Sequence, residues 1–132
     1  MSVVSLHSDL LKVLLVDDSA TVRERIKMLL ADVPGLEVAG EAAQADEALA
    51  VYRRVNPDVV ILDIRMPGGT GIGVLREIKR GSPAAVVVML TNFATPEHRS
   101  VCLAAGADYF LDKSTEFWDV LDILQDLPKR RN

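Results

Sequence analysis

The chain has 132 residues, which is enough for one domain with a single hydrophobic core. Its apolar and charged contents, 49% and 26%, are ordinary for a globular protein, and a net charge of −4 with both signs mixed excludes a broad basic surface for nucleic acid. The single cysteine, Cys102, excludes an intramolecular disulfide, and no apolar run approaches the roughly 18 residues that a membrane span needs. Residues 1–11 lack a signal-peptide pattern, so we expect a cytoplasmic protein that does not insert in membranes.

Five short apolar runs, rich in β-branched residues, are spaced along the chain, and each stops at or shortly before polar residues. Continuous apolar runs of this length are typical of strands buried on both faces of a parallel sheet. The predicted strands are Lys12–Val16, Leu36–Glu41, Val59–Leu62, Val86–Leu90 and the weaker Ala107–Leu111.

Helical patterns separate the predicted strands. Ser19 is the expected N-cap of the first helix, and Thr95 caps the fourth, with Pro96 at its first position. The helices are predicted from Ser19 to Val33, Ala45 to Val55, Gly71 to Arg80, Thr95 to Gly106, and Ser114 to Leu127, with Pro128 just beyond the last. No two strands are close enough for a hairpin. Five strand–helix units joined by right-handed crossovers predict a single doubly wound (βα)5 domain of the α/β class with a parallel sheet.

Polar residues follow the ends of four predicted strands. The first strand ends at Asp17-Asp18, the third at Asp63 and the fourth at Thr91, and Lys113 comes shortly after the fifth. Any one of these residues could be an ordinary turn former or helix cap. Ligands of open α/β sheets bind at the carboxyl ends of the strands, so the coincidence of all five predicts a functional site.

The residue types at this edge indicate phosphoryl chemistry. Three neighbouring carboxylates repel one another unless a cation lies among them, and Mg²⁺ prefers such oxygen ligands. Asp63 is the expected phosphoryl acceptor, because the Thr91 hydroxyl and the Lys113 ammonium are available to a new anion. In-line transfer would then proceed by positioning and charge neutralisation, without a histidine base, and we assign no catalytic role to His7 or His98.

Four segments together resemble the signature of response regulator receiver domains: Val16-Asp17-Asp18-Ser19, Leu62-Asp63-Ile64-Arg65-Met66-Pro67, Leu90-Thr91 and Asp112-Lys113. The resemblance covers residues 12–127. It leaves residues 1–11 as an N-terminal extension and residues 128–132 as a C-terminal tail or the start of a linker. It implies a flavodoxin-like five-stranded sheet of order 2-1-3-4-5.

The same resemblance implies roles for the site residues. The implied Mg²⁺ ligands are Asp18, Asp63 and the backbone carbonyl of Arg65, with Asp17 acting through water. Thr91 and Lys113 match the family's catalytic hydroxyl and lysine. The chain would therefore catalyse its own Mg²⁺-dependent phosphorylation and dephosphorylation, without being a conventional enzyme.

Three features depart from the usual receiver pattern or extend it, and the third is a pair of residues. Phe110 stands where the family commonly has a tyrosine that switches rotamer together with the hydroxyl residue, here Thr91; without a hydroxyl, Phe110 either switches by packing alone or simply fills space. Ser114 replaces the usual proline after the lysine, which puts a cis peptide in doubt because a non-proline cis bond costs about 2.5–4 kcal/mol. Arg65 and Phe93 flank the acceptor, and we expect them to hinder water and slow dephosphorylation.

The expected partners also follow from the resemblance. A sensor histidine kinase or a histidine phosphotransfer protein would donate the phosphoryl group. A downstream effector, or a second copy in a homodimer, would bind the face of the fourth helix, fifth strand and fifth helix. On the fifth helix an apolar stripe is predicted at Phe117, Val120, Leu121 and Leu124, with a half-exposed Trp118 beside Asp122 and Gln125. We expect no direct nucleic-acid binding by this domain.

Several alternatives stay open or are disfavoured. The chain is either a stand-alone receiver or a receiver fragment of a DNA-binding transcriptional regulator, and a degenerate receiver that only binds partners is a further possibility. A phosphatase of the haloacid dehalogenase type would want a carboxylate where Arg65 stands. A flavodoxin-like flavin binder is disfavoured because Asp17 and Asp18 would repel the flavin phosphate.

Overall fold

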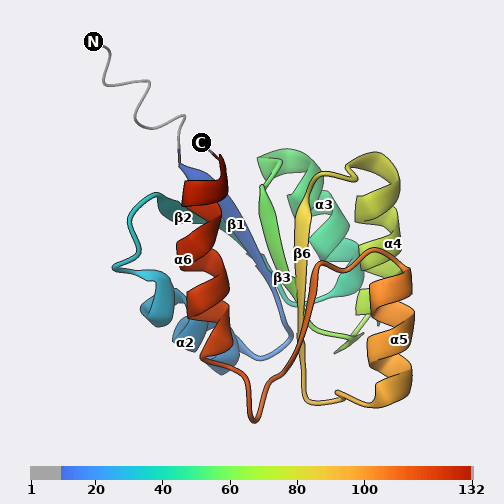
Figure 1. Cartoon of the computed structure of the whole chain (residues 1–132). Helices are drawn as coiled ribbons and strands as arrows, with labels where there is room; N and C mark the ends of the chain where they lie inside the picture. Colours follow the sequence, from blue (N-terminus) through green and yellow to red (C-terminus); the bar gives the residue numbers. More distant parts are fainter. Residues whose placement is uncertain (1–9, 132) are drawn as a thin grey trace.

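A computed structural model describes residues 10–131 of the chain, with residues 128–131 described by their backbone alone. Five parallel strands form one sheet in the order β2-β1-β3-β6-β7 (Figure 1). The strands are β1 (Leu11–Val16), β2 (Leu36–Ala42), β3 (Val59–Leu62), β6 (Val86–Thr91) and β7 (Tyr109–Asp112). Since β6 and β7 are the fourth and fifth strands of this sheet, the predicted doubly wound fold and its order 2-1-3-4-5 are confirmed.

Helices cover both faces of the sheet, α2 and α6 on one and α3, α4 and α5 on the other (Figure 1). The helices are α2 (Ala20–Leu30), α3 (Ala45–Val55), α4 (Gly71–Gly81), α5 (Pro96–Ala104) and α6 (Asp119–Arg131). Successive residues of one strand enter opposite cores: Leu14 packs towards α3 and α4, whereas Leu15 packs towards α2 and α6. Two buried faces explain why the central strand β3 is apolar at every position.

Side-chain caps fix two helix starts where the sequence predicts them. The Ser19 hydroxyl accepts a hydrogen bond from the Val22 amide at 3.2 Å, and the Thr95 hydroxyl accepts one from the His98 amide at 3.1 Å. Both hydroxyls satisfy amides that have no partner within the first helical turn. None of the helices in the described part of the chain combines the length and apolar character that crossing a membrane requires.

The prediction that no two strands form a hairpin was wrong. The two-residue strands β4 (Arg65–Met66) and β5 (Gly69–Thr70) pair in an antiparallel ribbon directly after Asp63. Gly68 and Gly69, with φ of 80° and 142°, adopt the backbone conformations that close the ribbon and that other residues rarely tolerate. The ribbon shapes the loop beside the acceptor.

The predicted bounds of the last helix were also wrong at both ends. Turns follow Lys113, because the Asp112 carboxylate accepts the Ser114 amide at 2.9 Å and its carbonyl accepts the Glu116 amide at 2.7 Å. Helix α6 therefore begins only at Asp119, and it continues through Pro128 to Arg131. The described residues contain no cis peptide bond, so the bond between Lys113 and Ser114 is trans.

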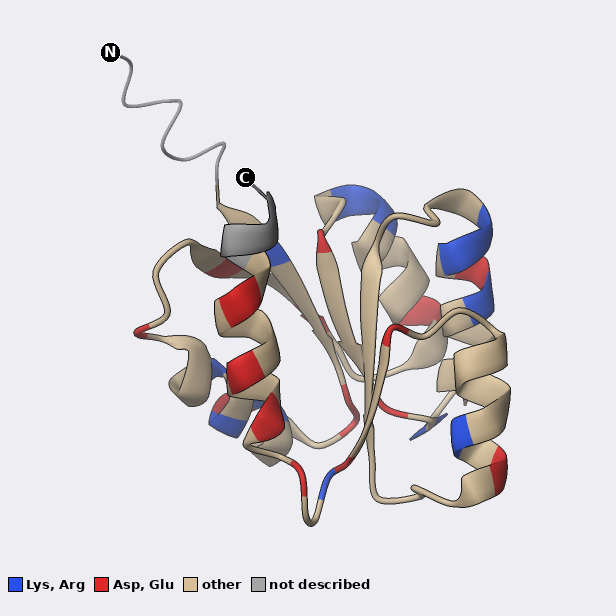
Figure 2. Cartoon of the chain, in the orientation of Figure 1, with Lys and Arg blue, Asp and Glu red and all other residues tan. Residues whose placement is uncertain are grey.

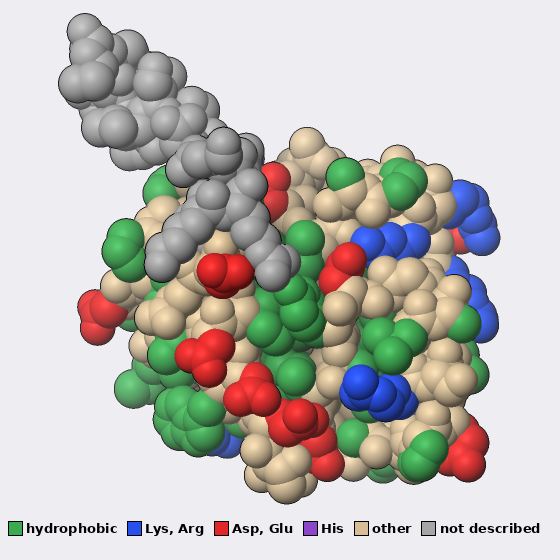
Figure 3. Space-filling view, in the orientation of Figure 1, with side chains coloured by type: hydrophobic (Ala, Val, Ile, Leu, Met, Phe, Trp, Pro, Cys, Tyr) green, Lys and Arg blue, Asp and Glu red, His purple; other side chains and the backbone are tan. Residues whose placement is uncertain are grey.

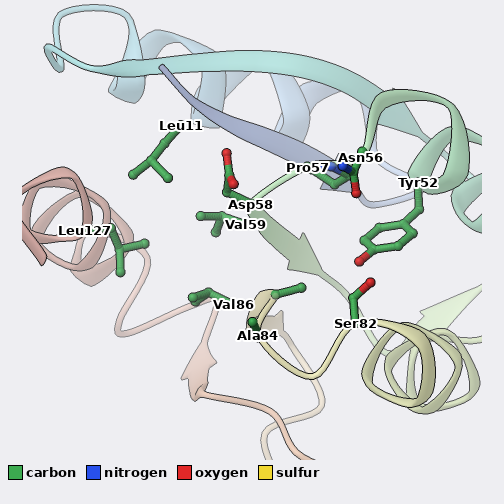
Figure 4. A pocket seen from close by; sticks show the side chains of 11 residues that line it. Leu11, Tyr52, Asn56, Pro57, Asp58, Val59, Ser82, Ala84, Val86 and Leu127 are labelled. Atoms are coloured by element: carbon green, nitrogen blue, oxygen red, sulfur yellow. The ribbon is translucent and has the colours of Figure 1, made fainter. Parts of the chain in front are cut away.

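A cavity of about 450 Å³ lies at the amino ends of the strands (Figure 4). It is lined mainly by apolar side chains together with a few polar ones: Leu11, Tyr52, Asn56, Pro57, Asp58, Val59, Ser82, Ala84, Ala85, Val86 and Leu127. The Asp58 carboxylate accepts the Lys12 amide at 2.9 Å. This edge of the sheet is opposite the one at which Asp17 and Asp63 emerge.

Candidate functional site

Four of the predicted site residues reach the carboxyl edge of the sheet from four different strands. Asp17 follows β1, Asp63 follows β3, Thr91 ends β6 and Lys113 follows β7. The side chains of Asp17, Asp63 and Thr91 are buried, with residue exposures of 3%, 5% and 0%. Parallel pairing puts these strand ends side by side, so residues far apart in the sequence meet here.

The Lys113 ammonium joins the two buried carboxylates. Its Nζ donates to Asp17 Oδ2 at 2.7 Å and to Asp63 Oδ2 at 2.9 Å. The second oxygen of each carboxylate accepts a backbone amide, from Ser19 at 2.9 Å and from Ile64 at 2.7 Å. Every carboxylate oxygen of this pair is therefore held in a defined position.

The electrostatics of the site leave it short of positive charge. Burial raises the pKa of Asp17 above its usual range, against hydrogen bonds from Lys113 and Ser19 that lower it, and the nearby Asp63 adds to the rise. Burial alone would lower the pKa of Lys113, but its hydrogen bonds to Asp17 and Asp63 outweigh burial and raise it. Lys113 is thus a firmly charged ammonium that faces more carboxylate than it can neutralise.

The three acids form a group that could hold a metal ion. One carboxylate oxygen from each of Asp17, Asp18 and Asp63 lies within 4.8 Å of the others. Asp17 and Asp63 are buried and Asp18 is exposed, so the group opens to solvent on one side. All of these donors are hard oxygens, which fits the preference of Mg²⁺. The Arg65 carbonyl as a further ligand stays a prediction.

The loop after β6 is tied to the site by its backbone. The Thr91 hydroxyl accepts the Phe93 amide at 3.0 Å, and the Thr91 carbonyl accepts the Lys113 amide at 2.8 Å. The Arg65 guanidinium carbon lies 3.8 Å from the centre of the Phe93 ring, a cation–π contact across the two loops. His98 Nδ1 lies 2.7 Å from the Phe93 carbonyl oxygen, and His98 is the donor because a carbonyl oxygen can only accept. This hydrogen bond holds the loop against α5.

Phe110 lies in β7 with only 6% of its surface exposed, and it packs in the core between the sheet and helices α3 to α5. The Arg99 guanidinium is 5.9 Å from the ring centre and donates to the Phe110 carbonyl at 3.3 Å. The ring is thus inward, and its role as a switch stays a prediction.

Two residues that shape the site were missed in the sequence. Arg23, in the second turn of α2, donates to the Asp17 carbonyl at 2.6 Å. At Gly71 a Cβ atom would lie 1.8 Å from the Asp63 carbonyl oxygen, so only glycine fits there. The glycine-rich run before α4 was a signal for a close backbone approach, whereas nothing in the sequence pattern marks Arg23.

A family model described as the response regulator receiver domain matches residues 13–125. The chain belongs to this family. As a receiver domain it is the phosphoacceptor signalling switch of a two-component system.

Curated relatives of this receiver are longer proteins. The response regulator GacA of Pseudomonas syringae is 34% identical over 116 residues, covering 88% of this chain and 54% of GacA. A protein-glutamate methylesterase/protein-glutamine glutaminase of Geobacter metallireducens is 45% identical over 100 residues, covering 74% of this chain and 29% of that protein. The receiver thus spans about half of the one relative and less than a third of the other.

Solved receiver structures share the fold. The response regulator domain of Thermotoga maritima CheB has a TM-score of 0.79 and 30% identity, covering 92% of this chain and 95% of that one. A LuxR-family two-component response regulator from Aurantimonas has a TM-score of 0.82 and 31% identity, covering 91% of this chain and 86% of that one.

Proposed function

We propose that Asp63 is the residue of this receiver that accepts the phosphoryl group, with Thr91 and Lys113 as its catalytic partners. The observation that carries the proposal is the Lys113 ammonium, which lies 2.9 Å from an Asp63 oxygen at a buried edge of the sheet. Of the three acids, Asp63 and Asp17 contact this cation and Asp18 faces solvent. Asp63 stands in the segment from Leu62 to Pro67 that resembles the family's acceptor segment, which favours it over Asp17 as the acceptor.

The proposed reaction is an in-line displacement at phosphorus. A carboxylate oxygen of Asp63 forms a bond to phosphorus while the bond from phosphorus to the donor's histidine nitrogen breaks, and the electron pair leaves with that nitrogen. Lys113 offers its ammonium to one phosphoryl oxygen, and Thr91 offers its hydroxyl to another. Positioning and charge neutralisation then supply the rate enhancement.

The acid group is proposed to hold Mg²⁺ through Asp18, Asp63 and the Arg65 carbonyl, with Asp17 acting through water. When bound, Mg²⁺ supplies positive charge to the phosphoryl oxygens that the ammonium alone cannot neutralise. The carboxylate oxygens of the three acids, which lie within 4.8 Å of one another, support this assignment.

Loss of the phosphoryl group requires water to attack the same phosphorus atom. We propose that the stacked Arg65 and Phe93 side chains restrict that water, so that the phosphorylated form decays slowly. The double replacement Arg65→Ala and Phe93→Ala is expected to shorten the half-life of the label several-fold. A half-life that stays unchanged in the double variant would remove this part of the proposal.

The proposed output surface is the face of α5, β7 and α6, where an inward Phe110 and Thr91 form the switch. Acidic residues recur along α6 (Figure 2), and the space-filling view shows hydrophobic side chains beside acidic ones on this face (Figure 3). Val101 and Leu103 on α5 are 39% and 40% exposed. This face is proposed to bind an effector or a second copy of the chain, while a histidine kinase or phosphotransfer protein donates the phosphoryl group.

Three further parts of the proposal concern the chain as a whole. The receiver unit is proposed to be residues 12–127, followed by a tail or linker start at 128–132. The proposed N-terminal extension, residues 1–11, lies mostly outside the described residues. A cytoplasmic location is supported by the single, reduced cysteine Cys102, which is buried.

Intact-mass spectrometry after incubation with a small phosphodonor tests the proposal. The native chain should gain the mass of one phosphoryl group only when Mg²⁺ is present, and Asp63→Asn should gain none. An Asp63→Asn variant that labels as well as the native chain would contradict it. If the native chain neither takes the label nor binds beryllofluoride, the favoured interpretation becomes a degenerate receiver that acts only by binding partners.

A further inference from the structure

The loop that carries Asp17 and Asp18 is held by an arginine of α2. Arg23 Nη1 donates to the Asp17 carbonyl oxygen at 2.6 Å, and the same guanidinium donates through Nε to the Glu41 carboxylate at 2.9 Å. Arg23 lies on α2 and Glu41 on β2, so one side chain links the loop, a helix and a strand. Only 17% of the Arg23 side chain is exposed.

The Asp17 carbonyl needs such a partner because the sheet ends here. The Asp17 amide still pairs with the Ala42 carbonyl at 3.0 Å, at the last residue of β2. Beyond Ala42 the backbone leaves the ladder and leads into α3, and the Ala43 amide donates to the Glu47 carboxylate at 2.8 Å. The Arg23 guanidinium supplies the Asp17 carbonyl with a hydrogen-bond partner at the end of the ladder.

Glu41 holds the guanidinium in place. Its carboxylate also accepts the Lys27 ammonium at 2.8 Å, and Lys27 pairs in turn with Glu24 at 2.6 Å. Hydrogen bonds from Lys27 and then Arg23 lower the pKa of Glu41, although burial opposes them, so Glu41 stays ionised near neutral pH. The Arg23 guanidinium is therefore held at two nitrogens, Nη1 by the Asp17 carbonyl and Nε by the Glu41 carboxylate.

The position of this arginine matters because three carboxylates crowd the site. Repulsion among Asp17, Asp18 and Asp63 opposes their close approach, and it acts against the Lys113 ammonium and the hydrogen bonds of the Asp17 and Ser19 amides. A fixed Asp17 carbonyl limits the rotation of the peptide that carries Asp18. Groups that orient metal ligands commonly change metal affinity by about 10–100-fold when removed.

We propose that Arg23, anchored by Glu41, is a positioning residue that holds Asp17 and Asp18 in the geometry for metal binding. The inference rests on the function proposed above. The Arg23 guanidinium also adds positive charge near the acids, and this charge by itself would weaken the binding of a cation. The proposal states that geometry outweighs charge, so removal of the guanidinium weakens Mg²⁺ binding.

Calorimetric titration of the phosphoryl-free chain with Mg²⁺ separates these effects. Arg23→Met keeps the aliphatic stem and loses the charge, whereas Arg23→Lys keeps the charge but cannot reach both partners. Both variants should raise the Kd for Mg²⁺ roughly tenfold. Glu41→Ala, which leaves Arg23 without its anchor, should raise it by a smaller factor. Lys27→Met is the matched control, because Lys27 contacts Glu41 but not the loop, and its Kd should stay within about twofold of native.

Two further readouts distinguish positioning from a general loss of stability. The labelling rate at saturating Mg²⁺ should stay near native in Arg23→Met, since Asp63, Thr91 and Lys113 are intact. Exchange of the Ser19 amide hydrogen without metal should accelerate in Arg23→Met and not in Lys27→Met, because that amide reports the Asp17 loop.

Equal or tighter Mg²⁺ binding in folded Arg23→Met would overturn the inference, even if its unfolding midpoint fell. If Arg23→Met does not fold, a native Kd in Glu41→Ala would overturn it instead. These outcomes are distinct from failure of the proposed function, in which the native chain itself would neither bind Mg²⁺ nor accept a phosphoryl group.

Discussion

The two edges of the sheet are built on opposite principles. At the carboxyl edge charged side chains are in direct contact, with Lys113 between Asp17 and Asp63. The amino edge holds a cavity of about 450 Å³ lined largely by apolar residues (Figure 4). The largest well-formed apolar pocket is the usual first guess for a binding site. That rule would select the amino edge, whereas the phosphoryl site proposed above is defined by charge and not by volume.

The two edges also differ in how they use polar atoms. Within the described residues no buried side-chain nitrogen or oxygen lacks a hydrogen-bond partner, and at the carboxyl edge these partners are the Lys113 ammonium and nearby backbone amides. At the amino edge Asp58 accepts a backbone amide of β1 and so fastens one strand start to its neighbour. Polar groups therefore serve chemistry at one edge and strand registration at the other.

The largest expected effect at the carboxyl edge comes from Gly71→Ala. The added methyl group would overlap the Asp63 carbonyl oxygen, 1.8 Å away, so the loop that carries the acceptor must move. We expect a loss of about 3 kcal/mol in the free energy of unfolding and slower labelling. Urea unfolding measures the first. Gly81→Ala is the control, since a Cβ at Gly81 meets nothing within 4 Å.

At the amino edge, Leu127→Ala should cost stability without cost to function. Leu127 is 8% exposed and lines the cavity, so its truncation enlarges a void. A loss of about 2 kcal/mol is expected in urea unfolding. The Mg²⁺ affinity and the labelling rate of the folded variant should stay within about twofold of native. A large change in the Mg²⁺ affinity or in the labelling rate would show that the amino edge influences the carboxyl edge, and it would contradict the separation of the two edges.

Asp17→Asn should stabilise the metal-free chain by about 1 kcal/mol at neutral pH. Burial raises the folded-state pKa of Asp17, so the contribution of this group to stability is greatest below the ordinary carboxyl pKa. That contribution is lost as the pH rises through the raised pKa, and asparagine avoids the loss. Urea midpoints from pH 4 to 8 in a chelator measure it. Added Mg²⁺ should raise the urea midpoint of the native chain and not that of the variant. Equal midpoints for the native chain and Asp17→Asn at every pH in the chelator would contradict mutual repulsion within the acid group.

The smallest effect is expected for Trp118→Ala. Trp118 is 67% exposed and contacts Phe117 edge-on at 5.8 Å between ring centres, so its removal should change the unfolding free energy by less than about 0.5 kcal/mol. Met28→Ala, at a residue that is 75% exposed on α2, is the control. Sedimentation of both variants with beryllofluoride tests the proposed partner surface. Native-like self-association of Trp118→Ala would argue against a role for this ring.

Much of the fold was predictable because buried strands and capped helices leave strong local patterns. The apolar run Val59–Leu62 is a strand with the predicted bounds, and the predicted caps Ser19 and Thr95 are present. The β4–β5 ribbon was missed because two-residue strands have no periodicity to detect. The start of α6 was missed because the Asp112 carboxylate captures the Ser114 amide, a turn that competes with the helix.

The candidate site was predictable in its members and less so in its supports. The strand ends bring Asp17, Asp63 and Lys113 together, as the order of the strands requires. The contact of Arg23 with the Asp17 carbonyl depends on where β2 ends beside β1, and no spacing in the sequence reports that. Trp118 was expected on the last helix, whereas it lies in the turn before α6 begins.

The most direct test of the account is the position of the phosphoryl group on the labelled chain. Borohydride reduces an aspartyl phosphate to homoserine, and peptide fragmentation by mass spectrometry then locates the altered residue. The account predicts homoserine at position 63 alone, only in samples labelled with Mg²⁺ present. Homoserine at position 17 or 18, or a label at position 63 that forms equally well in a chelator, would contradict the assignment of Asp63 as the metal-dependent acceptor.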